Sequence, residues 1–102
     1  MKNTYYVYII SNKYNAVLYI GVTNNLERRM WEHRNGSINN SFSKKYKLTK
    51  LLYYENYYDI NQAIQREKQL KNWHRQWKIN QIKTLNPNFH DLSAEWDCFN
   101  SN

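Results

Sequence analysis

The chain has 102 residues, of which 41% are hydrophobic and 17% aromatic, so it can bury one compact core and is too short for two. Its formal net charge of +7 favours a polyanionic partner, nucleic acid ahead of an anionic membrane, although a basic surface can also serve solubility alone. The single cysteine, Cys98, excludes an internal disulfide and a cysteine-rich zinc site and is typical of a reducing, cytoplasmic setting.

The N-terminal segment TYYVYIIS, residues 4–11, is aromatic and β-branched on both faces, which predicts a central strand. Its apolar part is too short for a signal-peptide core, and no stretch of the chain approaches membrane-spanning length. We therefore expect a soluble cytoplasmic protein. A polar turn and a second strand, residues 16–21, predict an antiparallel hairpin.

The register of this hairpin decides where two tyrosines lie. If the turn is centred between Lys13 and Tyr14, Tyr8 lies directly opposite Tyr19. Directly opposed residues point to the same face of a sheet. The hairpin is therefore expected to present two phenol groups side by side, which is also an ordinary way to stabilise a hairpin. Gly21 can be explained by the turn from strand to helix alone.

A helix is expected next. Asn24 is a suitable N-cap, Glu27 is its reciprocal partner three residues on, and Asn35-Gly36 is a typical end, so the helix should run to about Arg34. The apolar stripe consists of Leu26 and Met30.

Two residues of this helix lie beside the stripe, one helical turn apart: Arg29 and His33. Arg28 and Glu32 lie on the far side, toward water. Arg29 either offers its planar fork of donors to a phosphate or lies over the edge of the core and reaches solvent. His33, taken alone, is more simply explained as a partly buried structural histidine.

The rest of the chain predicts one strand and two helices. Residues 36–47 form a polar basic loop, and residues 48–56 form a third strand. Asp59 caps a long helix over residues 60–73, and a break near His74 leads to a last helix. The apolar residues of that last helix are Trp77, Ile79, Ile82 and Leu85.

Asn86-Pro87 stops the last helix, because proline cannot continue it. The tail from Asn88 is expected to be irregular. Its apolar residues, which should pack back on the domain, are Phe89, Leu92, Trp96 and Phe99.

The helix over residues 60–73 carries a carboxylate where an apolar residue is expected. Glu67 falls within the apolar stripe, while Arg66 and Lys68 diverge to either side. A carboxylate on a buried face is costly unless it is paired or coordinated. Glu67 therefore either makes an ion pair, with Arg29 or Lys71, or holds a divalent cation such as Mg²⁺ or Mn²⁺. The apolar stripe itself consists of Ile60, Ala63, Ile64 and Leu70.

The two phenols, the arginine and histidine of the first helix and the carboxylate of Glu67 are together the parts of metal-assisted phosphodiester hydrolysis. One cation polarises the phosphate, one group removes a proton from water, and a guanidinium neutralises the developing charge.

The pattern Tyr6-Val7-Tyr8 followed by Tyr19-Ile20-Gly21, then NLERRMWEH, Glu67 and NPNFHDL, resembles the GIY-YIG nuclease superfamily, in particular its small standalone bacterial members. The resemblance covers residues 4 to roughly 90. It implies an α+β fold with a small three-stranded antiparallel sheet flanked by about three helices, and cleavage of DNA with a divalent metal. Residues 1–90 would form the single domain and residues 91–102 a tail.

The resemblance also implies roles for single residues. Tyr8 matches the tyrosine that ends the first motif, and Tyr19 the tyrosine that opens the second. Arg29 matches the phosphate-contacting arginine, His33 a frequent proton-relay position, and Glu67 the metal ligand. The late asparagine of the family corresponds to Asn86, with Asn80 as the alternative.

The first motif departs from the family, because Tyr6 replaces its glycine and Val7 its isoleucine. We interpret this as altered packing at the start of the strand, which leaves room for a weakened or retuned site.

Basic residues alternate with aromatic ones in SKKYK (43–47) and REKQLKNWHRQWK (66–78), a mixture that suits phosphate contacts and base stacking. Trp73 and Trp77 can equally belong to the core. No separate DNA-reading module fits this length, so we expect low or structure-based specificity unless a protein partner supplies more. The predicted nucleic-acid contacts are Lys44, Lys45, Lys47, Arg66, Lys71 and Arg75.

The sequence thus predicts a metal-dependent endonuclease. Two alternatives remain: a weakly active or non-catalytic module that binds DNA or RNA, and a small basic RNA- or ribosome-associated protein.

Overall fold

The computed structural model describes residues 3–36 and 45–96. These contain, in chain order, β1 (Tyr5–Ser11), β2 (Leu18–Thr23), α1 (Leu26–Asn35), β3 (Lys50–Tyr57), α3 (Ile60–Asn72) and α4 (Arg75–Leu85). The strands form one antiparallel sheet in the order β2-β1-β3, so the predicted α+β fold with β1 at its centre is confirmed. Lys44, Cys98 and Phe99 lie outside the described residues.

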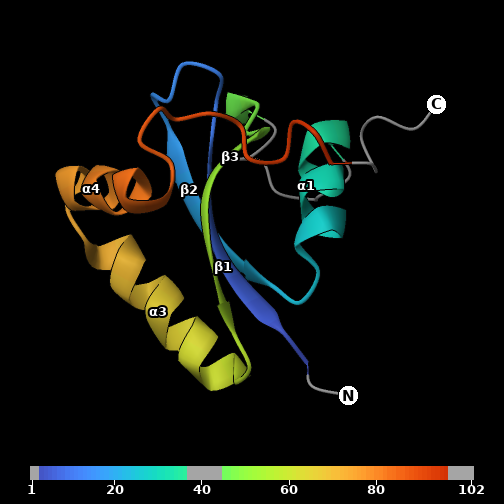
Figure 1. The fold of residues 1–102 in the computed structure, drawn as a ribbon, viewed down its shortest axis with the longest axis vertical. Coiled ribbons are helices and arrows are strands. Elements are labelled where there is room, and N and C mark those ends of the chain that lie inside the picture. The colour runs from blue at the N-terminus through green and yellow to red at the C-terminus, as the bar shows by residue number, and fades with distance from the viewer. Residues whose placement is uncertain (1–2, 37–44, 97–102) are drawn as a thin grey trace.

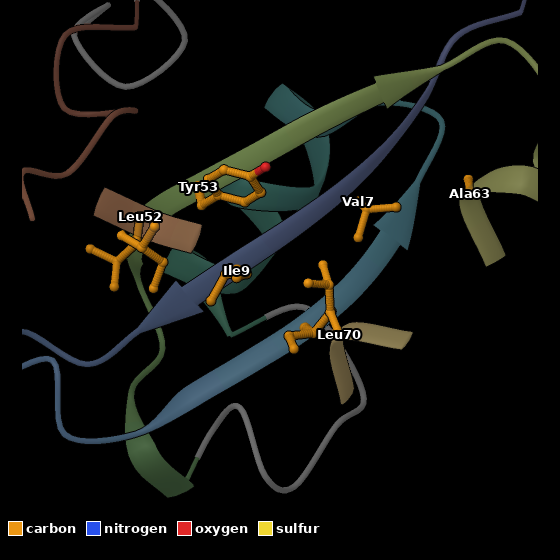
Figure 2. Packing of buried hydrophobic residues seen from close by; sticks show 8 residues of the cluster. Val7, Ile9, Leu52, Tyr53, Ala63 and Leu70 are labelled. Carbon is orange, nitrogen blue, oxygen red and sulfur yellow. The ribbon is translucent and has the colours of Figure 1, made fainter. Parts of the chain in front are cut away.

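Helices cover both faces of the sheet. Figure 1 shows α1 on one side and α3 with α4 on the other. Because successive side chains of a strand point to opposite faces, β1 contributes to two cores. Val7 and Ile9 belong to the core under α3 and α4, part of which Figure 2 shows, whereas Tyr8 and Ile10 belong to the core under α1. This double burial explains the unbroken apolar and aromatic run of β1.

The hairpin register differs from the prediction by two residues. Tyr8 pairs with Gly21, and Tyr19 pairs with Ile10, so the two tyrosines are diagonal neighbours and not directly opposed. The turn is longer than expected, because the Asn12 side chain accepts hydrogen bonds from the backbone N–H groups of Ala16 (2.8 Å) and Val17 (3.4 Å). An even shift keeps every side chain on its face, so both tyrosines still face α1.

The ends of α1 follow the helix rules, with one correction. Asn25, not Asn24, is the N-cap, and its side chain accepts a hydrogen bond from the backbone N–H of Arg28 at 3.0 Å. Glu27 therefore does not stand at the position of a reciprocal cap partner. At the other end Gly36 adopts the left-handed conformation, with φ 65°, as expected for the residue after a helix.

The remaining helices match the prediction closely. Asp59 caps α3 through a hydrogen bond from the backbone N–H of Asn61, and the break near His74 separates α3 from α4. Within the predicted apolar stripe of α3, Ala63 and Leu70 are fully buried, but Ile60, the first residue of the helix, is 39% exposed. No helix in the described ranges has the length and apolar character needed to cross a bilayer.

The tail packs back on the domain, as predicted. Phe89 lies against the core under α3 and α4, and Leu92 and Trp96 lie against the core under α1. The backbone N–H of Leu92 donates to the carbonyl of Leu51 in β3 at 2.8 Å, and Asp91 accepts from the backbone N–H of Leu51 at 3.1 Å. The segment thus passes along β3 from α4 toward α1.

Candidate active site

The side chain of Tyr8 lies over a glycine of the neighbouring strand. It is 1% exposed, and its ring lies across Gly21, its partner in β2. A β carbon built on Gly21 would lie 2.5 Å from Tyr8 Oη and 2.6 Å from its Cζ. Gly21 is therefore needed for space, which corrects the interpretation that it only eases the turn into the helix. Because β2 is an edge strand, the ring carries the phenol from the centre of the sheet toward that edge.

The Tyr8 hydroxyl is within hydrogen-bonding distance of His33. Tyr8 Oη lies 3.2 Å from His33 Nε2, and His33 is only 6% exposed. The Tyr19 ring also packs edge-on against the imidazole, with centroids 6.0 Å apart, close to the 5.9 Å between the rings of Tyr8 and His33. The two phenols predicted to share a face therefore do share it, and they meet at the histidine of α1.

The electrostatics of this pair define its protonation. Burial raises the pKa of Tyr8 well above its usual range; Arg29 opposes the rise, while Tyr19 and Glu67 add to it. Burial, assisted by Arg29, lowers the pKa of His33 to about 4. At neutral pH the phenol is thus protonated and the imidazole neutral, so the Tyr8 hydroxyl donates and His33 Nε2 accepts.

Arg29 brings a positive group with spare hydrogen-bonding capacity. Its Nε is buried and has no hydrogen-bond partner among the described residues. Glu32 stands 3.6 Å from that atom, and the Arg29 side chain is 37% exposed, against 75% for the adjacent Arg28. The prediction that Arg29 and not Arg28 lies beside the core is confirmed. The prediction that Glu32 points toward water is wrong. Its side chain is 25% exposed and lies between Arg28 and Arg29.

The charge of Glu67, on α3, adds to the rise in the pKa of the same phenol. The Glu67 side chain is only 17% exposed, and Lys71 Nζ lies 3.6 Å from its carboxylate. The predicted ion pair with Lys71 is confirmed, and no ion pair joins Glu67 to Arg29 in the part of the chain that is described. Because both Glu67 and Arg29 act on the pKa of Tyr8, the site brings together charges from α1 and α3.

A divalent cation fits this donor set. Residues 3–36 and 45–96 contain no group of three or more His, Cys, Asp or Glu side chains that could hold a metal by themselves. Mg²⁺ does not require one, because it commonly binds through one or two carboxylates together with substrate phosphates and waters. Glu67 offers such a single, partly buried carboxylate, whose only ion-pair partner among the described residues is the half-exposed Lys71.

Asn86 lies apart from this group. Its amide donates to the carbonyls of Leu52 (3.0 Å) and His90 (2.7 Å), and its oxygen accepts from the backbone N–H of His90. It is 4% exposed and lies against β3, whereas the Tyr8 ring lies over β2. Its catalytic role therefore stays a prediction. The alternative, Asn80, is exposed on α4 and accepts a hydrogen bond from Gln76.

A cavity of about 690 Å³ adjoins the site on the α1 face. His33 contributes to its wall, together with Lys13 and Tyr14 of the hairpin turn and with Tyr46 and Lys47. Its polar and aromatic lining suits a nucleotide. Completing the wall are Asn12, Arg34, Gly36 and Thr49.

The predicted nucleic-acid contacts are not equally accessible. Lys45 and Lys47 are exposed, and Lys71 is half-exposed beside Glu67. Arg75 is exposed, although its guanidinium donates to the Asn15 carbonyl at 2.8 Å. Trp73 packs against the core, whereas Trp77 is 54% exposed, so the two tryptophans have different environments.

Arg66 is engaged inside the protein. It binds Glu55 of β3 through Nε and Nη2, with the latter at 2.9 Å, and lies over the Trp73 ring. Burial alone would raise the pKa of Glu55, but its bonds to Arg66, Tyr53 and Tyr57 outweigh burial and lower it. A nucleic-acid contact by Arg66 would compete with these bonds and stays a prediction. The signal that sequence reasoning missed is a period of two, which places Tyr53, Glu55 and Tyr57 on one strand face.

Comparisons with known proteins found a family model and relatives that match this chain. The family model described as the GIY-YIG catalytic domain matches residues 4–80. A UPF0213 protein of Syntrophus aciditrophicus is 33% identical over 78 residues, which cover 76% of this chain and 88% of that protein. A UPF0213 protein of Staphylococcus haemolyticus is 34% identical over 79 residues, covering 78% and 94% respectively.

A solved structure resembles the fold. The solution NMR structure of a UPF0213 protein from Bacillus halodurans aligns with a TM-score of 0.55 at 19% identity, covering 90% of this chain and 97% of that one. This likeness concerns the fold alone.

Proposed function

This chain belongs to the GIY-YIG catalytic domain family, and we propose that it is a divalent-metal-dependent endonuclease that hydrolyses DNA phosphodiester bonds. One observation carries the proposal. The Tyr8 ring lies across Gly21 and its hydroxyl reaches His33. The charges of Arg29 and Glu67 both affect the pKa of this phenol. A phenol and a neutral imidazole can transfer a proton, a guanidinium can neutralise developing charge and a carboxylate can hold a cation, which together support metal-assisted phosphodiester hydrolysis.

Glu67 would hold the cation, either Mg²⁺ or Mn²⁺. When bound, the cation neutralises charge on the phosphate and on the leaving oxygen. Arg29 would bind the non-bridging phosphate oxygens. Its buried Nε supports this role, because it has no hydrogen-bond partner among the described residues. Asn86 stays outside this group because its amide is engaged by backbone atoms.

The Tyr8–His33 pair would move the proton of the attacking water. A phenol that stays protonated at neutral pH cannot take a proton from water by itself. His33 Nε2 would accept the Tyr8 proton as the Tyr8 oxygen takes one from water, and the negative charge of the bound phosphate would stabilise the imidazolium that forms against its lowered pKa. Tyr19, packed on the same imidazole, would keep the ring in place.

The nucleic acid would enter beside the cavity that His33 lines. Lys45, Lys47 and Tyr46 surround this approach with positive charge and an aromatic ring, a combination that binds phosphates and stacks bases without reading sequence. This supports low or structure-based specificity, with a protein partner as the source of any stronger selection.

The replacement of the motif glycine by Tyr6 is compatible with catalysis. Tyr6 packs edge-on against Tyr54, with ring centroids 6.4 Å apart, and it pairs with Thr23 near the end of β2. This supports the interpretation of altered packing at the start of the strand, away from the Tyr8 hydroxyl.

Conversion of supercoiled plasmid to nicked circles tests the proposal. We expect nicking with Mg²⁺ or Mn²⁺, no nicking with EDTA, and a loss of at least a hundredfold for Glu67→Gln. Lys68→Gln, an exposed neighbour on α3, serves as the matched control and should cut like the parent. Plasmid that is bound but never cut would favour the non-catalytic binding module instead.

A further inference from the structure

A smaller cavity lies between β2, α3 and α4. It has a volume of about 240 Å³ and is lined by Leu18, Tyr19 and Ile20 of β2, by Lys71 of α3 and by Lys78 of α4. Tyr19 therefore contacts the candidate catalytic histidine and also borders this cavity. Tyr19 is thus the residue that this cavity shares with the candidate active site.

The charge of this cavity is positive. Two ammonium groups from two helices line the same space, and its other lining residues are uncharged. Lys71 pairs with Glu67, but Lys78 is partly buried and makes no side-chain hydrogen bond or ion pair within residues 3–36 and 45–96. An anion in the cavity would therefore meet an ammonium group that no described carboxylate neutralises.

We propose that Lys71, Lys78 and Tyr19 form a second phosphate subsite, which binds a DNA phosphate neighbouring the scissile one. This inference rests on the proposed function and names the path of the bound strand. Tyr19 packs on the His33 imidazole and also lines this cavity, so a strand whose scissile phosphate lies at the Tyr8–His33 pair would have a neighbouring phosphate near the two lysines.

Lys78 is the residue that isolates this subsite. Lys71 also faces Glu67, so replacing it would disturb the candidate metal ligand as well. Lys78 lines the cavity without an ion pair to a candidate catalytic residue. Lys83, exposed on the same helix and absent from this cavity's lining, offers a matched control that removes the same charge.

The test is the equilibrium binding of a fluorescein-labelled DNA duplex in EDTA, measured at several salt concentrations. One lost phosphate contact lowers the slope of log K against log salt by about 0.9, which is a loss of about eightfold in affinity at 0.1 M salt. We expect this loss for Lys78→Gln and little change for Lys83→Gln, with equal thermal stability. Equal affinities for the two variants would overturn the subsite, and so would Lys78-dependent binding of RNA without binding of DNA.

Binding and cleavage separate the two proposals. Plasmid nicking together with equal binding by the two variants would overturn the subsite and leave the endonuclease standing. Selective weakening by Lys78→Gln in a protein that never cuts DNA would support the subsite and overturn the endonuclease.

Discussion

Gly21 and Tyr8 face each other across β1 and β2, and the tyrosine ring occupies the space that a β carbon of residue 21 would need. The hydroxyl thereby reaches His33 Nε2 at 3.2 Å. The glycine of β2 thus determines where the ring of Tyr8 in β1 lies.

Gly21→Ala should displace the Tyr8 ring and break its bond to His33. The added carbon would lie 2.5 Å from Tyr8 Oη, so we expect a loss of about 1–3 kcal/mol in unfolding free energy and a fall in nicking rate of more than tenfold. Urea unfolding and plasmid nicking measure the two effects.

The control for this change is Gly36→Ala. Gly36 has φ +65° with no atom near its missing β carbon, so alanine there should cost about 1 kcal/mol of stability without changing the activity of the folded protein. If both alanine variants lose activity equally, the close approach at Gly21 is not what matters.

Arg29→Lys should reduce nicking strongly while leaving stability nearly unchanged. Lysine keeps the charge but lacks the planar fork and the buried Nε, so we expect a fall in kcat of about a hundredfold. Arg28→Lys changes an adjacent side chain that is 75% exposed and should cut like the parent. Similar rates for the two variants would show that the helix face does not distinguish these arginines.

His33 should make the stability of the protein depend on pH. Its folded pKa of about 4 lies below the usual 6.5, so the unfolded chain binds a proton at a pH where the folded protein does not. The stabilisation is therefore complete above pH 6.5 and is lost as the pH falls toward 4, by at most about 1.4 kcal/mol per pH unit.

Urea titrations between pH 4.5 and 7.5 test this dependence against His33→Gln. The variant should show a flatter pH profile, because His74 and His90 remain in both proteins and their contributions cancel. Parallel profiles would contradict a buried, neutral His33.

Arg66→Gln should destabilise the fold by about 2–4 kcal/mol, because it leaves Glu55 with a charge that is only 17% exposed and lacks its cationic partner. Chemical denaturation measures the loss. Arg28→Gln, which removes a mostly exposed arginine, should cost less than about 0.5 kcal/mol. A small loss at Arg66 would mean that water or the neighbouring tyrosines compensate Glu55.

The sequence was sufficient wherever periodicity governs the structure. Helical spacing distinguished Arg29 from Arg28 and placed Glu67 among buried residues, and an even error in the hairpin register left both tyrosines on the correct face. The position of the N-cap was missed because Asn24 and Asn25 are equally suitable, and only the geometry of the turn into α1 selects one.

Contacts between distant residues could not be predicted in this way. The role of Gly21 depends on a ring that is supplied thirteen positions earlier, and the engagement of Arg66 depends on Glu55 in another element. Lys78 was not among the predicted contacts because its spacing resembles a solvated helix face; its cavity exists only once β2 and α4 are packed together.

The most direct test of the central claim is a crystal structure of the protein soaked with Mn²⁺. The account predicts an anomalous peak bound to the Glu67 carboxylate, on the side that faces the Tyr8 hydroxyl, with the Lys71 ammonium displaced from Glu67. A structure at saturating Mn²⁺ that shows no peak at Glu67, or a peak whose ligands exclude that carboxylate, would contradict it.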